Sequence, residues 1–272
     1  MNTPLVTIVT PVKNNIKYVE ECLYSVVTQK YPYIEHFLVD GGSTDGTLEV
    51  IMKYQEAYPS RIRYISEPDK GSSDGLVKGM KQSYGSIIGI LGSDDVLQPG
   101  AIQKVVDFFD DNPQASFVFG GCNRIDEKGN YISKMLLHDF DLNWAVNNYV
   151  SIPGTSAYFK RMVVDKVDPS VMIKGNSEIE WWLQIAQRFT IHRIEPVLSN
   201  FRIYDDKQRR DGFYINASTN WNVNKRYGAS RWSPCARRYY LALLARPLSP
   251  ILDPIFRYIT QGTCNLSCQE SA

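Results

Sequence analysis

The sequence predicts an α/β protein whose central sheet is mostly parallel and flanked by helices, followed by a C-terminal helical extension. Two observations carry this prediction. From residue 5 to about residue 121, short β-rich apolar runs alternate with longer amphipathic stretches, which indicates βαβ units and a sheet covered on both faces. Beyond residue 121 the alternation loosens, and the last part of the chain contains helical stretches interrupted by prolines.

The predicted strands of the first half are short runs rich in Val, Ile and Phe. They span residues 5–11, 34–40, 61–66, 86–91 and 115–121. Between them apolar residues recur at helical spacing, as Val19, Leu23 and Val26 do in the first stretch. The predicted helices cover residues 18–29, 47–58, 74–85 and 100–112.

The second half is predicted to begin with a hairpin that turns at Lys128, Gly129 and Asn130. The elements expected after it are a strand within residues 152–164, a helix over residues 177–189 and an extended segment over residues 192–204. No internal repeat or low-complexity linker divides the chain. We therefore expect one domain over residues 1–205 and an extension over residues 206–272.

Charge and cysteine usage narrow the class of protein. The net charge of +1 over 272 residues lacks the excess of Lys and Arg expected of a nucleic-acid-binding protein. The five cysteines are odd in number and have no CxxC spacing, and Cys22 and Cys122 are predicted to be buried reduced thiols of a cytoplasmic protein. The first residues lack the pattern of a secretory signal, and no apolar run approaches the ~20 residues that span a bilayer.

Polar residues follow four of the predicted strands, where open parallel sheets bind ligands. They are Thr10, Pro11 and Lys13 after the first strand, Asp40 after the second, Glu67 and Asp69 after the third, and Asp94 and Asp95 after the fourth. Adjacent carboxylates repel each other unless a cation or hydrogen-bond donors compensate. The Asp94–Asp95 pair therefore indicates either a cation site or a helix cap.

Two loops add more specific signals. In "DGGSTDGT", residues 40–47, glycines allow a sharp turn while Asp40 offers an acceptor for a ribose hydroxyl or a base N–H. Ser43, Thr44 or Asp45 in the same string is expected to cap the following helix. In "SEPDKGSSDG", residues 66–75, Lys70 and Gly71 suit a phosphate, whereas Asp74 suits either a cap or a ligand contact.

Taken together, "DGGSTDGT", "EPDKGSSDG" and "GSDDVLQPGA" closely resemble the motifs of family 2 glycosyltransferases with the GT-A fold, over roughly residues 5–205. The resemblance implies a Rossmann-like nucleotide-sugar-binding half over residues 1–121 and an acceptor-binding half over residues 122–205. It implies inverting transfer of a hexose-type sugar from a nucleotide-sugar donor, with a UDP-sugar favoured. The acceptor would be a hydroxyl of a glycan or lipid-linked molecule in surface polysaccharide or glycoconjugate biosynthesis.

The resemblance also implies roles for individual residues. Asp95 would be the principal ligand of Mn²⁺ or Mg²⁺, with Asp94 facing both the ribose and the metal. The residues expected to bind the nucleotide sugar are Thr10, Pro11, Asp40, Asp69, Asp74, Asp94, Lys207 and Arg209. The last two would contact the diphosphate, although a solvated charged loop explains them nearly as well.

Glu178, at the start of the "EIEWWLQIA" helix, matches the position of the family's catalytic base. Glu180 is interpreted as favouring the positive helix N-terminus. Two positions depart from the family pattern, because Ser177 stands where an acid is usual and Tyr204 stands where a histidine often helps to bind metal or diphosphate. These departures leave open a second hypothesis, a catalytically silent relative that binds a nucleotide sugar or glycan.

The extension combines arginines with apolar and aromatic residues, most densely between Arg231 and Ile259. This composition suits peripheral contact with an anionic membrane surface, which would place the protein at the inner face of the cytoplasmic membrane. A helix that packs back onto the domain, or a contact between copies in a homo-oligomer, is the alternative. The sequence leaves these three interpretations open.

Overall fold

The computed structural model describes residues 3–148, 152–175, 178–204 and 217–245. The chain divides into two compact units by its internal contacts. The sheet unit comprises Met1–Leu142 and Ser151–Arg202, and the helical unit comprises Asn143–Val150 and Ile203–Ala272. The predicted division at residue 205 into a catalytic domain and an extension stays a functional prediction.

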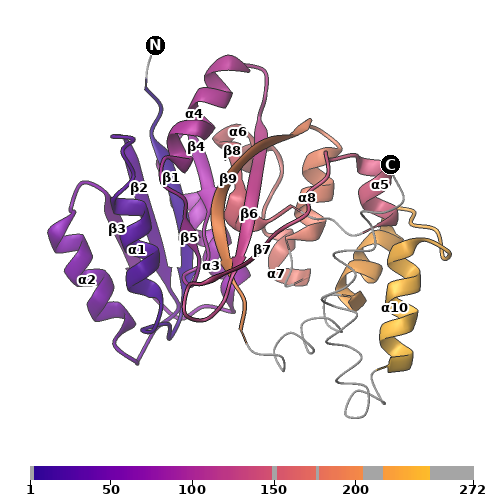
Figure 1. Cartoon of the computed structure of the whole chain (residues 1–272), viewed down its shortest axis with the longest axis horizontal. Helices are drawn as coiled ribbons and strands as arrows, with labels where there is room; N and C mark the ends of the chain where they lie inside the picture. Colours follow the sequence, from indigo (N-terminus) through magenta and orange to yellow (C-terminus); the bar gives the residue numbers. More distant parts are fainter. Residues whose placement is uncertain (1–2, 149–151, 176–177, 205–216, 246–272) are drawn as a thin grey trace. The chain divides into compact units, whose positions relative to one another are not determined.

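One nine-stranded mixed sheet forms the centre of the sheet unit, in the order β3-β2-β1-β4-β8-β6-β9-β5 with β7 paired to β6 (Figure 1). The strands are β1 (Val6–Val12), β2 (Ile34–Asp40), β3 (Ile62–Ser66), β4 (Ile87–Ile90), β5 (Val96–Leu97), β6 (Phe117–Ile125), β7 (Tyr131–Lys134), β8 (Ala157–Lys160) and β9 (Ile191–Arg202). Strands β3, β2, β1 and β4 run parallel, β8 pairs antiparallel with β4 and β6, and β6 runs parallel to β9. The predicted fold class, α/β with a mostly parallel sheet, is confirmed.

Helices cover both faces of the sheet because neighbouring strand residues point to opposite sides. The helices are α1 (Val19–Val27), α2 (Thr47–Ala57), α3 (Ser72–Gln82), α4 (Ala101–Asp111), α6 (Arg161–Lys166), α7 (Val171–Gly175) and α8 (Ile179–Ala186), with a short 3₁₀ helix, η1 (Gly154–Ser156). Ile8 of β1 belongs to one core with residues of α1 and α4. Its neighbour Val9 faces α3, which approaches closely because Gly79 has no side chain there.

The second half of the sheet unit contains both expected and unexpected elements. The predicted hairpin is confirmed, with Gly129 at φ 85° between β6 and β7. The strand predicted within residues 152–164 is shorter than expected, because η1 precedes β8 and α6 follows it. Trp181 and Trp182 of α8 are both buried against Phe117 and Phe159, so neither ring is exposed for stacking on a sugar.

The helical unit contains α5 (Leu142–Asn147), a helix over residues 217–226 and α10 (Pro234–Ala245). A small core of Trp221, Cys235 and Ala236 holds the last two together. The buried Asn224 amide donates to the carbonyl oxygens of Ala145 and Asn148, at 3.2 and 3.1 Å. Within the described residues, every helix is too short or too polar to cross a bilayer.

Candidate active site

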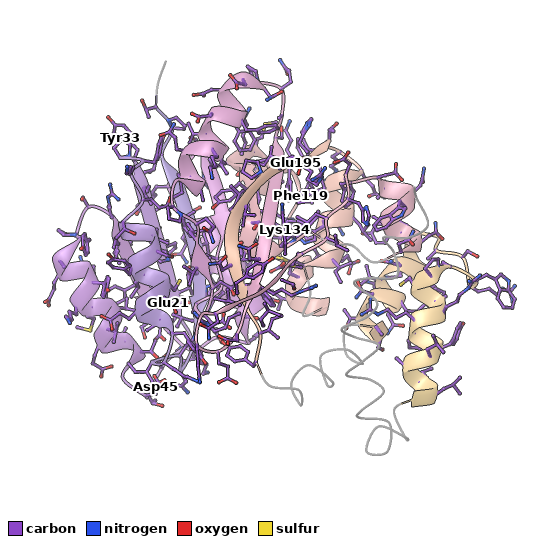
Figure 2. The ribbon with its side chains drawn as sticks, viewed as in Figure 1. Glu21, Tyr33, Asp45, Phe119, Lys134 and Glu195 are labelled. Carbon is purple, nitrogen blue, oxygen red and sulfur yellow. The ribbon has the colours of Figure 1, made fainter. Side chains whose placement is uncertain are left out.

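The loops after the parallel strands meet at one edge of the sheet, as the sequence predicts. The backbone N–H of Asn14, after β1, donates to Ser43 Oγ after β2 at 2.8 Å. The side chain of Asn15 donates to Ser93 Oγ after β4 at 2.7 Å. In Figure 2 Asp45, after β2, lies at the opposite end of the sheet from Tyr33, which precedes the same strand. The polar loops therefore share one surface.

Asp40 ends β2 with its side chain completely buried, and the surrounding loops saturate its carboxylate. The backbone N–H groups of Gly42 and Ser43 donate to it at 3.1 to 3.2 Å. The hydroxyls of Ser43 and Ser66 donate at 2.5 and 2.6 Å. Asp40 thus fixes the turn after β2 and joins it to the end of β3. Its predicted nucleoside contact is untested.

Asp69 occupies the space that a side chain at position 41 would need. A Cβ atom added to Gly41 would collide with the Asp69 carboxylate, and one added to Gly75 would lie 3.0 Å from Pro11 Cβ. Gly71 N–H donates to Asp69 Oδ1 at 2.9 Å, which orients the carboxylate. Glycines at positions 41 and 75 therefore allow Asp69 and Pro11 to approach the backbone closely.

Two other predicted donor-binding residues have their side chains engaged elsewhere. Thr10 is completely buried, and its hydroxyl lies 2.9 Å from Nε2 of the equally buried His36. Asp74 accepts from Lys70 N–H at 3.1 Å and pairs with Lys78 at 3.4 Å. Asp74 therefore closes the loop before α3. The prediction that Ser43, Thr44 or Asp45 caps α2 is wrong, because the N-cap residue is Gly46 and no side chain caps the helix, although Asp45 accepts from Thr47 N–H at 3.0 Å.

The Asp94–Asp95 pair lies in the loop between β4 and β5, and Asp95 is 3% exposed. Arg202 N–H donates to Asp95 Oδ1 at 2.9 Å. Burial and the neighbouring Asp94 carboxylate raise the pKa of Asp95 to about 8. Donors around Asp95 thus fail to offset the loss of its hydration.

The two aspartates fit a divalent cation as part of its coordination shell. Asp95 Oδ2 and Asp94 Oδ1 lie 2.7 and 2.9 Å from the position that a Cβ atom on Gly92 would take. Carboxylate oxygens are the ligands that Mg²⁺ and Mn²⁺ prefer. No group of three His, Cys, Asp or Glu side chains among the described residues forms a complete protein site. Further ligands would have to come from a bound molecule or from water.

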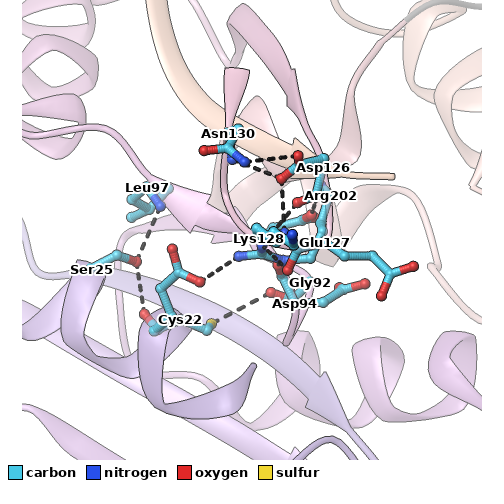
Figure 3. A network of polar contacts seen from close by, with 12 residues as sticks. Cys22, Ser25, Gly92, Asp94, Leu97, Asp126, Glu127, Lys128, Asn130 and Arg202 are labelled. Carbon is cyan, nitrogen blue, oxygen red and sulfur yellow. Dashed lines mark hydrogen bonds and ion pairs between the residues drawn. The ribbon is translucent and has the colours of Figure 1, made fainter. Parts of the chain in front are cut away.

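Arg202 is a buried arginine that holds the double-aspartate loop in place (Figure 3). Its Nε donates to the Asp94 carbonyl at 2.8 Å, and one terminal nitrogen donates to the Asp126 carbonyl at 3.1 Å. The other terminal nitrogen pairs with Glu21 at 2.5 Å. Arg202 therefore joins β9, the loop after β4, the hairpin and α1. The sequence analysis missed this residue.

The short helix η1 lies between Asp95 and Glu178. Thr155 is 5% exposed and lies beside Asp95, where its hydroxyl favours the charged carboxylate without completing a hydrogen bond of regular geometry. A Cβ atom on the preceding Gly154 would lie 2.5 Å from Glu178 Oε2. Ser156 fixes η1 to β6, because its hydroxyl donates to the Gly121 carbonyl at 3.1 Å. Adjacent residues of η1 thus contact the two carboxylates.

Glu178 precedes α8, and the surrounding protein raises its pKa to about 7 through burial of the carboxyl group. Such a group exchanges its proton near neutral pH, as a general base requires. Because η1 lies between Glu178 and Asp95, the two carboxylates do not share one site. Lys207, Arg209 and Ser177 lie outside the described residues, and Tyr204 belongs to the helical unit.

Comparisons with known proteins identify the family of the chain. The Glycosyl transferase family 2 profile matches residues 7–168, more than half of the chain. The chain belongs to glycosyl transferase family 2. The teichuronic acid biosynthesis glycosyltransferase TuaG of Bacillus subtilis is 25% identical to this glycosyltransferase over 208 residues, which are 75% of this chain and 81% of TuaG. The chondroitin synthase of Escherichia coli is 35% identical over 130 residues, which are 48% of this chain and only 19% of the synthase.

Solved structures confirm the GT-A-like fold of this glycosyltransferase. The mannosyltransferase PcManGT from Pyrobaculum calidifontis, solved with GDP-Man and Mn²⁺, has a TM-score of 0.63 at 16% identity. The match covers 97% of this chain and 81% of PcManGT. S. aureus TarS residues 1–349, solved with UDP, has a TM-score of 0.58 at 14% identity, with coverage of 79% and 65%. At these identities the likeness concerns the fold.

Proposed function

We propose that the protein is an inverting glycosyltransferase that moves a sugar from a nucleotide-sugar donor to a hydroxyl group. The observation that carries the proposal is the arrangement around η1, where Thr155 lies beside Asp95 and Gly154 lies against Glu178. A cation-binding carboxylate and a separate carboxylate with a pKa near 7 are the two groups that such a transfer needs. Their placement at the carboxyl ends of the strands agrees with ligand binding there.

The donor is proposed to lie along the loops after β1 to β4, with a UDP-sugar favoured over other nucleotide sugars. Pro11 and Asp69 line the base pocket, and Asp40 holds the shape of the adjoining turn for the nucleoside. TarS has been solved with UDP and with UDP-GlcNAc, which supports this donor class. PcManGT takes GDP-Man, so the choice of base is the finer part of the proposal.

Asp95 and Asp94 are proposed to hold Mn²⁺ or Mg²⁺ together with the donor diphosphate. When bound, such an ion neutralises the charge that develops on the departing nucleoside diphosphate. The separation of roles follows from burial. Asp95, being 3% exposed, is held in one orientation by Arg202, whereas Asp94 is partly exposed and its side chain can reach the donor.

Glu178 is proposed to be the catalytic base. It takes the proton from the acceptor hydroxyl while that oxygen forms a bond to the anomeric carbon. The bond from this carbon to the diphosphate oxygen breaks, and the leaving group retains the electron pair. One displacement through an oxocarbenium-like transition state inverts the anomeric centre. Thr155 acts as a positioning residue, because its hydroxyl lies beside the Asp95 carboxylate.

The acceptor is proposed to be a glycan or lipid-linked molecule used in building a surface polysaccharide. The support is the kind of product named for the relatives, teichuronic acid and chondroitin. TuaG supports the proposal more strongly than the synthase does, because the match covers 81% of the length of TuaG.

The test is to measure release of nucleoside diphosphate from a panel of nucleotide sugars, with Mn²⁺, by the wild type and by Glu178→Gln and Glu180→Gln. Glu178→Gln keeps the size of the side chain but removes the base, so we expect a loss of at least about 100-fold in kcat. Glu180→Gln, two residues further along, is the matched control and should stay near wild type. Donor binding should persist in both variants.

The pH profile gives a second measurement of the same proposal. A base must be deprotonated to act, so kcat/KM of the wild type should rise with pH through about 7, the pKa of Glu178, and then level off. The residual activity of Glu178→Gln should lack this rise. If donors bind but neither protein turns over any of them, the protein is instead a catalytically silent binding relative.

A further inference from the structure

On α10 several large apolar side chains are exposed while small ones are buried, which is the reverse of the pattern expected for a packed helix. Its inward side consists of three small residues and one aromatic ring, since Cys235, Ala236 and Ala242 are at most 5% exposed and Tyr239 stacks on Trp221. Leu241 and Leu244 are 65% and 72% exposed. A helix that only packed onto its own unit would turn its leucines inward, because burial of a leucine side chain stabilises the folded state.

Basic residues accompany the exposed leucines. Arg237, Leu241 and Leu244 lie at positions i, i+4 and i+7 and so share one face of the helix. Arg238 and Tyr240 flank this face, and both are exposed. Just before the helix, Trp232 is 73% exposed. We call these six residues the α10 face.

The sequence around α10 is strongly basic. Residues 212–252 contain no Asp or Glu but contain Lys225, Arg226, Arg231, Arg237, Arg238 and Arg246. The whole chain carries a net charge of only +1, so the basic charge is concentrated here. A nucleic acid would use the arginines but gain little from the leucines, whereas an anionic lipid surface uses both.

We propose that the α10 face binds the surface of an anionic membrane, with the leucines and Trp232 inserted at the headgroup level and the arginines paired with lipid phosphates. Trp is favoured at this level because its ring is amphipathic. The helix has 12 residues and therefore a length of ~18 Å, which is too short to cross the ~30 Å core of a bilayer. It would lie in the plane of the interface. The inference does not depend on glycosyl transfer.

The test is sedimentation of the full chain with vesicles of phosphatidylglycerol and phosphatidylcholine in equal parts, and with vesicles of phosphatidylcholine alone. We expect binding to the mixed vesicles, weakened by added salt, and at least about tenfold weaker binding to phosphatidylcholine alone. The double variant Leu241→Ser with Leu244→Ser should lose at least about tenfold in affinity. The pair Arg237→Gln with Arg238→Gln should lose about tenfold on the mixed vesicles only.

The matched control is a variant that lacks two exposed apolar side chains on helices of the sheet unit. Tyr24 of α1 and Met52 of α2 are 60% and 42% exposed, and the double variant Tyr24→Ser with Met52→Ser should bind vesicles as the wild type does. Thermal unfolding checks that each variant is folded. The fluorescence difference between the wild type and Trp232→Phe should shift to shorter wavelength when mixed vesicles are added.

Three results would overturn the proposal. The first is that the wild type fails to sediment with the mixed vesicles. The second is equal loss of binding in the α10 variants and in the Tyr24→Ser, Met52→Ser control. The third is a wild-type dimer in analytical ultracentrifugation that the leucine variants dissociate, without vesicle binding, since the α10 face would then be a contact between two copies of the chain.

Discussion

Two loops at the same edge of the sheet each bury an aspartate at the carboxyl end of a parallel strand. The two carboxylates differ in how many hydrogen-bond donors surround them. Asp40 after β2 is saturated by two backbone N–H groups and two serine hydroxyls. Asp95 after β4 accepts one backbone hydrogen bond from Arg202 and lies next to the like-charged Asp94. Burial alone therefore does not distinguish a structural carboxylate from a reactive one.

The difference shows where a cation would stabilise the protein. Donors around Asp40 replace the water that its carboxylate loses on folding, so a bound ion is not needed there. At Asp95 burial and repulsion from Asp94 remain uncompensated, as the raised pKa shows. A divalent cation would offset both, so we propose that the metal binds at the end of β4 and that the end of β2 shapes the donor site.

The largest effect is expected from Asp95→Asn. The amide keeps the shape of the side chain but removes the charge, so we expect a loss of about 100-fold or more in kcat/KM for sugar transfer with Mn²⁺. Asp107→Asn, an exposed acid on α4, is the control and should stay near wild type. Transfer by Asp95→Asn within about threefold of wild type would remove Asp95 from the metal site.

Asp40→Asn should mainly affect stability. An amide has one acceptor oxygen, so one of the two hydroxyls that now donate to separate carboxylate oxygens, that of Ser43 or that of Ser66, loses its partner. We expect a decrease of about 1–3 kcal/mol in the free energy of unfolding, measured by urea denaturation. The increase in Tm on adding Mn²⁺ should be kept. A lost Mn²⁺ response with unchanged stability would reverse the roles assigned to the two loops.

Thr155→Val should have the smallest effect of the three and tests whether η1 positions Asp95. Valine has nearly the shape of threonine, and the hydroxyl it replaces is buried without a regular hydrogen bond, so Tm should stay the same or rise. We expect a loss of about tenfold in kcat/KM, because the Asp95 carboxylate loses the polar neighbour that favours its charged form. Thr28→Val, at the exposed C-cap of α1, is the control. Unchanged kcat/KM would make Thr155 a packing residue only.

The fold was largely predictable because its signals are local. The runs that became β1 to β4 are short, β-branched and separated by amphipathic stretches, so period and length alone assign them. The meeting of their loops at one edge followed from the parallel order. The two-residue strand β5 and the five-residue helix α7 carry too few residues for a periodic pattern, and they form through contacts with distant segments.

The site was predictable where its residues lie in polar, glycine-containing loops after strands or match the family pattern, as Glu178 does. Asp40, Asp69 and the Asp94–Asp95 pair stand out in sequence for this reason. Arg202 does not, because hydrophobic alternation along β9 would turn Phe201 inward, whereas Phe201 is 45% exposed and Arg202 is 2% exposed. The partners that reverse this pattern, Glu21 and Asp94 among them, are remote in sequence.

The most direct test of the central claim is isothermal titration of UDP into the wild type and Asp95→Asn, each with and without Mn²⁺. We expect Mn²⁺ to strengthen UDP binding to the wild type by about tenfold or more and to leave UDP binding to Asp95→Asn unchanged. The same Mn²⁺-dependent gain in both proteins would contradict the assignment of the cation to the end of β4. UDP binding to neither protein, with or without Mn²⁺, would contradict the proposed uridine nucleotide donor.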